Sequence, residues 1–280
     1  MAEGTGLATF LVVFREALEA SLIVGIMLTV LARLKAHRYF LHTAVSVIAA
    51  VFLSFLLGSW MAAFSEAAQD KAKEILEGVI SLCAAGVLTY MFFWMERQAR
   101  KIKSDVETKV ETALSMEDAA ALLSLPFFAV LREGAETVLF LKAVAIQNGG
   151  AVSQMGGWLG LGLAVFIAGL IFAGGRKVPL KPLFRTTGIL ILFMAAGLLA
   201  YGIHELEEAG WIPSFIYPVW NTNSIVNEKE GVGSFLKALF GYNGNPSLTE
   251  VLAYGTYLTS VSFSLFRKRR SFLTAVGRED

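Results

Sequence analysis

Long runs of apolar residues recur along the chain and are separated by shorter polar connections. A helix needs about 20 mostly apolar residues to cross a bilayer, and seven stretches meet or approach that length. Gly156 and Gly160 in the fifth stretch have the GxxxG spacing that allows close helix packing. The pattern predicts an all-α integral membrane protein with seven transmembrane helices, at roughly 7–32, 41–64, 75–95, 120–146, 154–174, 184–207 and 248–266.

Composition agrees with this class of protein. The 280 residues are 55% hydrophobic and 17% charged, with a mean hydropathy of +0.60. Soluble domains carry about 25% charged residues. The formal net charge of +1 gives no reason to expect a nucleic-acid partner. The single cysteine, Cys83, lies in an apolar run and is expected to be a buried, inert thiol.

The distribution of Lys and Arg predicts the direction of the chain. These residues collect in the connections on the cytoplasmic side of a membrane. With the N-terminus placed outside, 17 of the 24 Lys and Arg residues fall on the inner side and 4 on the outer side. The other three, Arg15, Arg132 and Lys142, lie within apolar stretches. We therefore expect an N-out, C-in topology.

Two charged motifs interrupt the first and fourth apolar stretches. Residues 15–19 read Arg-Glu-Ala-Leu-Glu, and residues 132–136 read Arg-Glu-Gly-Ala-Glu. Residues three or four apart share a helix face, so Arg15 can reach Glu19 while both glutamates of its motif project together. Each ionised side chain near mid-span costs about 2.5–3.5 kcal/mol. Six such groups require pairing, hydration or a bound ligand.

The positions of the two motifs predict an internal repeat. The first and fourth spans must cross the membrane in opposite directions, so spans one to three and four to six form an inverted repeat. Such repeats are typical of secondary transporters, whose substrate site lies near the midplane. We expect a single permease domain over 1–280, with repeats at about 5–96 and 117–208, a seventh helix at about 247–267 and a cytoplasmic helix at about 97–116.

The converging motifs present four carboxylates and two guanidinium groups, which together favour a cation. Carboxylates are hard oxygen ligands, and the motifs contain no Cys or Met, so Cu(I) is disfavoured. Ferric iron, manganese and calcium all stay open on this chemistry. Two other interpretations use the same residues: a structural lock made of Arg–Glu pairs, and a proton relay that binds no metal.

A second polar group lies on the predicted outer side. A cluster of acidic groups raises the local concentration of cations. The residues of this polar group are therefore candidates for an outer entrance. Acids at helix ends are also common without such a role, because Glu near a helix start complements the helix dipole. The candidates lie at the start of the third span and the end of the sixth, and are Glu74, Glu77, His204, Glu205 and Glu208.

The paired motifs resemble those of the oxidase-dependent ferric iron permeases, a family that includes the fungal high-affinity iron permease and bacterial iron and lead uptake permeases. The likeness also covers the span count, the direction and the segment His-Glu-Leu-Glu-Glu-Ala-Gly at 204–210. It implies a transporter and not an enzyme, which takes up iron, in the ferric form, across a plasma membrane or bacterial inner membrane. Matched residue by residue, it implies that Glu16, Glu19, Glu133 and Glu136 bind the metal and that Arg15 and Arg132 tune the charge.

The resemblance also implies a partner protein. Family members receive iron from a protein that oxidises or delivers it, and we expect that partner to be a separate extracytoplasmic chain. No permanent cofactor is expected, since iron is the transported substrate. The alternatives are a permease for lead or another divalent cation, and a non-transporting membrane metal sensor.

Overall fold

A computed structural model describes residues 2–98, 102–116, 118–150, 152–174 and 180–276. Within these ranges the chain is helical and contains no strand. Each of the seven predicted stretches lies inside one long helix. The long helices are α1 (Ala2–Arg33), α2 (Phe40–Ala67), α3 (Asp70–Gln98), α5 (Ala119–Gln147), α6 (Gln154–Gly174), α7 (Leu180–Glu208) and α9 (Leu248–Val276); the shorter ones are η1 (His37–Tyr39), α4 (Ile102–Ser115) and α8 (Gly231–Phe240).

Four helices in the described ranges, α2, α3, α6 and α7, are long and apolar enough to cross a membrane. The other three long helices do not meet this standard. In α1 and α5 the motifs put at least three charged residues into every 18-residue window, and in α9 Ser, Thr and Tyr lower the hydropathy. The count of seven spans and their direction therefore stay predictions. α4 falls within the cytoplasmic helix expected at about 97–116. Residues 99–101, in the first part of that expected helix, lie outside the described residues. So do five of the basic residues assigned to the inner side, Arg100, Lys101, Arg176, Lys177 and Arg278.

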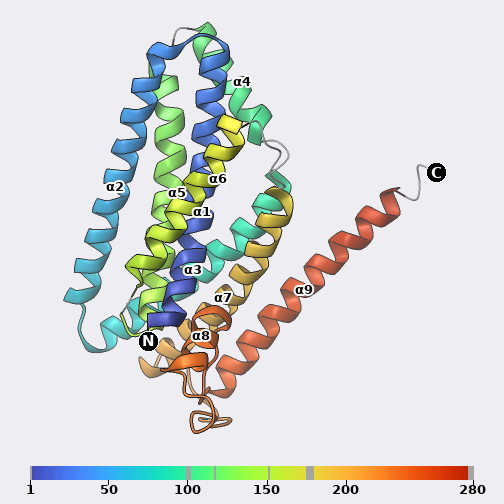
Figure 1. Ribbon diagram of the computed structural model, residues 1–280. Helices are drawn as coiled ribbons and strands as arrows, with labels where there is room; N and C mark the ends of the chain where they lie inside the picture. Colours follow the sequence, from blue (N-terminus) through green and yellow to red (C-terminus); the bar gives the residue numbers. More distant parts are fainter. Residues whose placement is uncertain (1, 99–101, 117, 151, 175–179, 277–280) are drawn as a thin grey trace.

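The long helices α1, α2, α5 and α6 lie side by side, while α9 diverges from the bundle (Figure 1). α1 and α5 run in opposite directions, as predicted. Leu122 near the start of α5 shares an apolar cluster with Leu31 near the end of α1. Val144 near the end of α5 shares another cluster with Ala8 near the start of α1. α8 and the N-terminus lie at one end of the bundle, and α4 lies at the other (Figure 1).

The helix pairs follow a symmetric pattern. α1 packs chiefly against α6 and α5, α2 against α5, and α3 against α7. If α1, α2 and α3 are matched with α5, α6 and α7, the pair α1–α6 becomes α5–α2, while α1–α5 and α3–α7 map onto themselves. An inverted repeat with a two-fold axis in the membrane plane has this pattern. The packing therefore supports the predicted repeat.

Small residues let these helices approach closely. A Cβ atom on Gly160 of α6 would lie 2.7 Å from the carbonyl oxygen of Phe10 and 2.9 Å from the backbone nitrogen of Phe14, both on α1. Gly156, one turn earlier, meets the backbone of Gly6 in the same way. The GxxxG spacing thus serves packing, as predicted.

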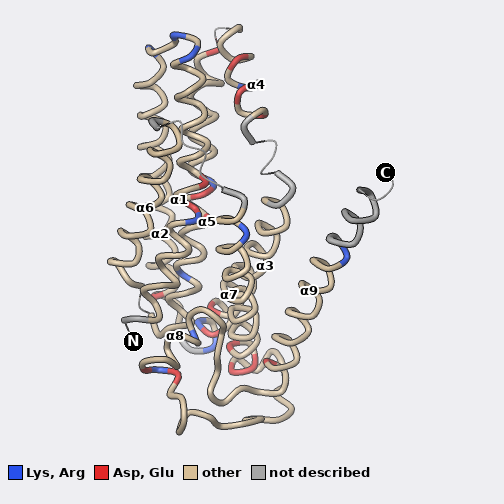
Figure 2. Tube along the Cα trace, turned by 45° about the vertical axis from the view of Figure 1, so that its right-hand side comes forward, with Lys and Arg blue, Asp and Glu red and all other residues tan. Residues whose placement is uncertain are grey.

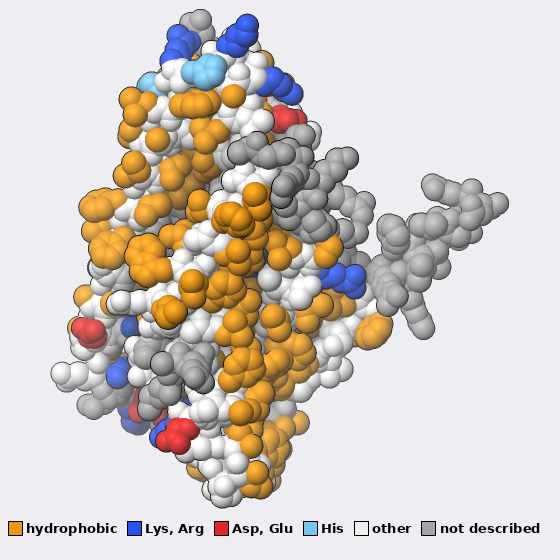
Figure 3. Space-filling view, viewed as in Figure 1, with side chains coloured by type: hydrophobic (Ala, Val, Ile, Leu, Met, Phe, Trp, Pro, Cys, Tyr) orange, Lys and Arg blue, Asp and Glu red, His pale blue; other side chains and the backbone are white. Residues whose placement is uncertain are grey.

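The face of the bundle seen in Figure 3 is apolar over much of its length. α2 and α6 expose large side chains, such as Phe55, Trp60 and Trp158, as helices that face lipid do. Lys, Arg and His side chains gather at one end of the same face (Figure 3). The expectation of a buried Cys83 is wrong, because this residue is exposed on α3. An apolar residue on a membrane helix can face outward as readily as inward, which the sequence alone does not distinguish.

The close α1–α6 contact gives a first testable prediction. Gly160→Ala should destabilise the protein by about 1–3 kcal/mol, since its methyl group must displace backbone atoms. Gly162→Ala on the same helix is the matched control, because a Cβ atom there meets nothing within 4 Å. Thermal unfolding in detergent, followed by circular dichroism, should show a lower Tm for Gly160→Ala alone. An equal loss of Tm in both variants would contradict the packing described.

Candidate metal centre

The two charged motifs lie at the middle of their helices. Residues 15–19 are centred within α1, and residues 132–136 are centred within α5. Because α1 and α5 are antiparallel neighbours, both motifs reach the same level of the bundle. Charged residues accordingly appear between the two ends of the molecule as well as at them (Figure 2). The predicted midplane cluster therefore forms within one helix pair.

In each motif the arginine forms a hydrogen bond with the second glutamate. Nε of Arg15 donates a hydrogen bond of 3.1 Å to Oε1 of Glu19, and Nε of Arg132 donates one of 2.9 Å to Oε1 of Glu136. These are the predicted pairs at a separation of four residues. The neighbouring glutamates are more distant, with nitrogen–oxygen separations of 3.7 Å for Arg15–Glu16 and 3.8 Å for Arg132–Glu133. The two copies of the motif thus have nearly the same internal geometry.

Three of the four predicted ligands converge across the helix pair. Glu16, Glu19 and Glu133 each offer a carboxylate oxygen, and these oxygens lie within 4.8 Å of one another. All three side chains are buried. Glu136 is not in this group; it lies one helical turn further along α5 and accepts a hydrogen bond from Arg132. We refer to Glu16, Glu19, Glu133 and Glu136 together as the glutamate cage.

Several polar atoms of the cage are buried without a hydrogen-bond partner in the described part of the chain. They are both carboxylate oxygens of Glu16, Oε2 of Glu133 and Oε2 of Glu136. Buried charged groups without partners are strongly destabilising. A cation among these oxygens would satisfy them, and an all-oxygen donor set suits a hard cation. Four carboxylates and two guanidinium groups leave a net charge of −2 when all six are ionised.

The structure adds a set of cage neighbours on α3 that sequence reasoning missed. Nη2 of Arg15 lies 3.7 Å from Sδ of Met95, and Nη2 of Arg132 lies 3.0 Å from Sδ of Met91. The guanidinium carbon of Arg132 also lies 4.4 Å from the centre of the Trp94 ring. The spacing of these three residues places them on one helix face. No sequence signal connects that face with the distant motifs.

The predicted outer residues gather where the end of α7 meets the start of α3. Nδ1 of His204 lies 3.0 Å from Glu250, and its Nε2 lies 3.4 Å from Glu208. Glu205 is buried and lies within electrostatic range of Glu77 and Glu208. Glu77 is paired with Lys73 at 3.9 Å. Half-buried Glu74 keeps one buried oxygen without a partner among the described residues.

Glu207 lies at this end together with the predicted residues, and Glu250, for which the sequence indicated no role, joins them. His204, Glu207 and Glu250 each place one ligand atom within 4.8 Å of the others. Glu250 accepts a hydrogen bond from the backbone nitrogen of Ser247, whose hydroxyl accepts one from the backbone nitrogen of Glu250. This reciprocal pair is a capping box at the start of α9. The Ser-x-x-Glu pattern at 247–250 was the available signal for a buried carboxylate here.

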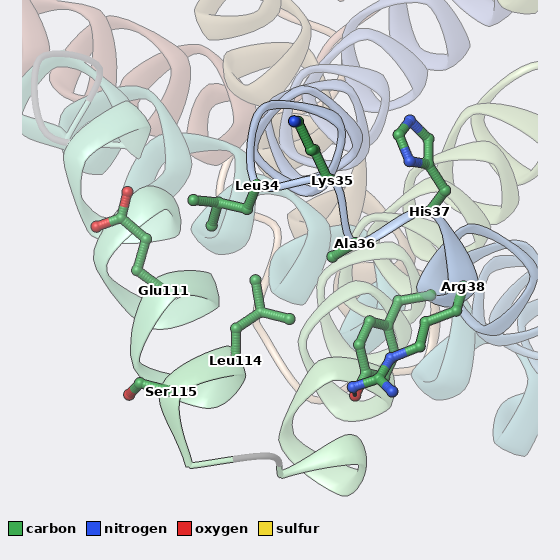
Figure 4. Close-up of a pocket in the computed structure, with 9 residues that line it drawn as sticks. Leu34, Lys35, Ala36, His37, Arg38, Glu111, Leu114 and Ser115 are labelled. Atoms are coloured by element: carbon green, nitrogen blue, oxygen red, sulfur yellow. Dashed lines mark hydrogen bonds between the residues drawn. The ribbon is translucent and has the colours of Figure 1, made fainter.

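Two cavities lie away from the cage. One of about 180 Å³, lined by His204, Glu250 and Lys237 among others, sits under the connection between α7 and α9. The other, of about 700 Å³, separates α4 from the turn between α1 and α2. In that second cavity Lys35 and His37 point away from Glu111 (Figure 4). Its basic groups do not converge, so it offers no built site.

Comparison with known proteins decides the family. A profile of the Iron permease FTR1 family matches residues 6–277. The chain belongs to this family. The Ferrous iron permease EfeU of Yersinia pestis is 34% identical over 264 residues, which cover 94% of each chain. That of Escherichia coli O6:H1 is 33% identical over 268 residues, covering 95% of this chain and 97% of that protein. No solved structure matches.

Membership confirms the resemblance drawn from the motifs. The chain is an iron permease of this family, a multi-pass membrane transporter and not an enzyme, and iron is its transported substrate. A non-transporting sensor does not fit a permease family. The names of the relatives specify ferrous iron, whereas the family resemblance led us to expect the ferric ion.

The unequal burial of the two arginines of this permease gives a second prediction. Arg15 is 2% exposed and Arg132 is 39% exposed. Arg15→Gln leaves buried carboxylates without their cation and should cost about 3–5 kcal/mol. Arg132→Gln should cost less, because the partly exposed Arg132 is less completely desolvated in the folded protein. Thermal unfolding in detergent should rank the Tm values in that order. Arg33→Gln, which removes an exposed ion pair with Glu111, is the control. Equal losses at Arg15 and Arg132 would contradict the prediction.

Proposed function

We propose that this permease moves iron, in the ferric form, through the glutamate cage near the middle of the membrane. The observation that carries the proposal is the group of buried, unpartnered carboxylate oxygens contributed by two antiparallel helices. Arg15 and Arg132 tune the charge of the cage. The membrane is a plasma membrane or bacterial inner membrane, crossed by seven helices with the N-terminus outside.

Loading of the cage follows from the single hydrogen bond that holds each paired carboxylate. Glu19 and Glu136 each accept a hydrogen bond from the Nε–H group of their arginine at Oε1, so Oε2 takes no part in that bond. An arriving cation competes for the bonded oxygen and releases the guanidinium group. Ligand carboxylates must be deprotonated to bind, so iron binding is coupled to proton release.

A second candidate for the oxidation state is ferrous iron. The hardness of the carboxylate donors favours the ferric ion. A dication, in contrast, neutralises the net charge of −2 on the cage, and the relatives are named for ferrous iron. The two candidates differ in whether an oxidising partner must act before uptake. Lead and other divalent cations compete for the same oxygens.

We infer that Glu74, Glu77, His204, Glu205 and Glu208 form an outer entrance to the cage. They gather at the end of α7 and the start of α3, on the predicted outer side. Clustered carboxylates attract cations from solution and from a delivering protein. A separate extracytoplasmic partner that oxidises or delivers iron would dock at this end. The matched packing of α1–α3 and α5–α7 supports inward release by movement of one repeat against the other.

A third prediction tests the cage by radioactive iron uptake into sealed proteoliposomes. Glu19→Ala and Glu136→Ala should each lower initial uptake at least about tenfold, as expected when a ligand of the transported ion is lost. Glu111→Ala, which removes an exposed carboxylate on α4, should leave uptake unchanged. Supplying iron as ferrous or as ferric citrate, with unlabelled lead as a competitor, identifies the ion moved. Wild-type vesicles that bind iron without accumulating it would contradict transport by the chain alone.

A fourth prediction concerns the outer entrance. Glu205→Gln together with Glu208→Gln should raise the iron concentration for half-maximal uptake about three- to tenfold at low salt, with little change in maximal rate. The difference from wild type should shrink as ionic strength rises, since screening removes long-range attraction. Glu111→Gln is the control for loss of a carboxylate elsewhere. A lower maximal rate that salt does not alter would point to a structural role instead.

A further inference from the structure

Both motif arginines are bound from outside their own motifs by α3. Apart from the motif glutamates, the hydrogen bonds of the two guanidinium groups in the described residues go to sulfur atoms of Met91 and Met95. Trp94 adds its ring against the guanidinium group of Arg132. Met91 and Met95 are buried, yet they lie outside the apolar clusters that hold Met27 and Met194. Met91 and Met95 thus bring buried sulfur atoms to the charged groups of the cage.

We propose that Met91, Trp94 and Met95 form a guanidinium platform, which receives the two arginines when iron displaces them from Glu19 and Glu136. These three are positioning residues, because they act on the transported ion only through Arg15 and Arg132. The inference rests on the proposed function of the glutamate cage.

The chemistry of the platform suits this role. A thioether sulfur is a weak but polarizable acceptor, and an indole face attracts a cation. Such a surface keeps a guanidinium group inside the protein without offering it an oxygen as strong as a carboxylate. The arginine can therefore exchange between a glutamate and the platform, whereas additional carboxylate partners would fix it in one place.

The platform favours the loaded cage over the empty one. In the empty cage each guanidinium group is hydrogen-bonded to its glutamate, and the contact with the methionine sulfur is the weaker of its two interactions. After iron takes the glutamate oxygen, the sulfur and the ring are the remaining partners of the cation. A contact that matters more in the loaded state raises the affinity for iron, because affinity depends on the difference between the two states.

A fifth prediction tests the platform by iron binding. The purified full-length chain in detergent is titrated with radioactive ferric citrate and, separately, with ferrous iron under reducing conditions. The double variant Met91→Leu, Met95→Leu should bind iron about three- to tenfold more weakly than wild type, in the range of a lost cation–acceptor contact. The double variant Met27→Leu, Met194→Leu makes the same chemical change at two other buried sites and should bind within about twofold of wild type.

A second comparison separates positioning from general packing. If Met91 acts through Arg132, then Met91→Leu should have no effect on iron affinity when Arg132→Gln is already present. An unchanged affinity in the Met91→Leu, Met95→Leu variant overturns the platform and leaves the proposed function intact. So does a loss that persists beside Arg132→Gln or that appears equally in the Met27 and Met194 control. A wild-type chain that binds no iron overturns both proposals, while binding without vesicle uptake contradicts transport by the chain alone and still tests the platform.

Discussion

The constraint on which this structure depends is the presence of six ionisable side chains, all but Arg132 largely buried, in the middle of an apolar helix bundle. At about 2.5–3.5 kcal/mol each, unpaired charges at this depth would cost on the order of 15–20 kcal/mol. That sum exceeds the stability of a typical domain, about 5–15 kcal/mol. The Arg15–Glu19 and Arg132–Glu136 pairs offset part of it. The unpartnered oxygens of Glu16 and Glu133 are the part that pairing within the motifs leaves uncompensated.

The repeat architecture brings those charges together at one level of the bundle. Motifs at the midpoints of two antiparallel helices necessarily meet, whatever the fine details of the packing. Close contacts made by small residues seal the surroundings: Gly160 sits against the backbone of α1, and Gly134, inside the second motif, sits against Ser54 of α2. A side chain at Gly134 would push α2 from α5 at the level of the cage. The middle glycine of the second motif therefore has a packing role, and the matching Ala17 packs against the cluster that contains Ala164 of α6.

The sequence predicted the helices and the motif pairs because each depends on local spacing. Apolar runs located every long helix, and a separation of four residues located both Arg–Glu hydrogen bonds. Prediction was weaker where contacts join distant segments. Met91 and Met95 look like ordinary core residues, and only the tertiary structure places their sulfur atoms against the two arginines. Cys83 shows the same limit, since a uniformly apolar helix does not reveal which face meets lipid.

The two motifs are equivalent in sequence but not in environment. The Arg15 side chain is buried, whereas more than a third of the Arg132 side chain is exposed. Both arginines also contact α3 of the first repeat, and the matching helix α7 makes no hydrogen bond to either guanidinium group in the described residues. A site that was fully symmetric about the cage would open equally to both sides of the membrane. The proposed route through the cage needs such an asymmetry, because alternating access in an inverted repeat requires one site that is reached unequally from the two sides.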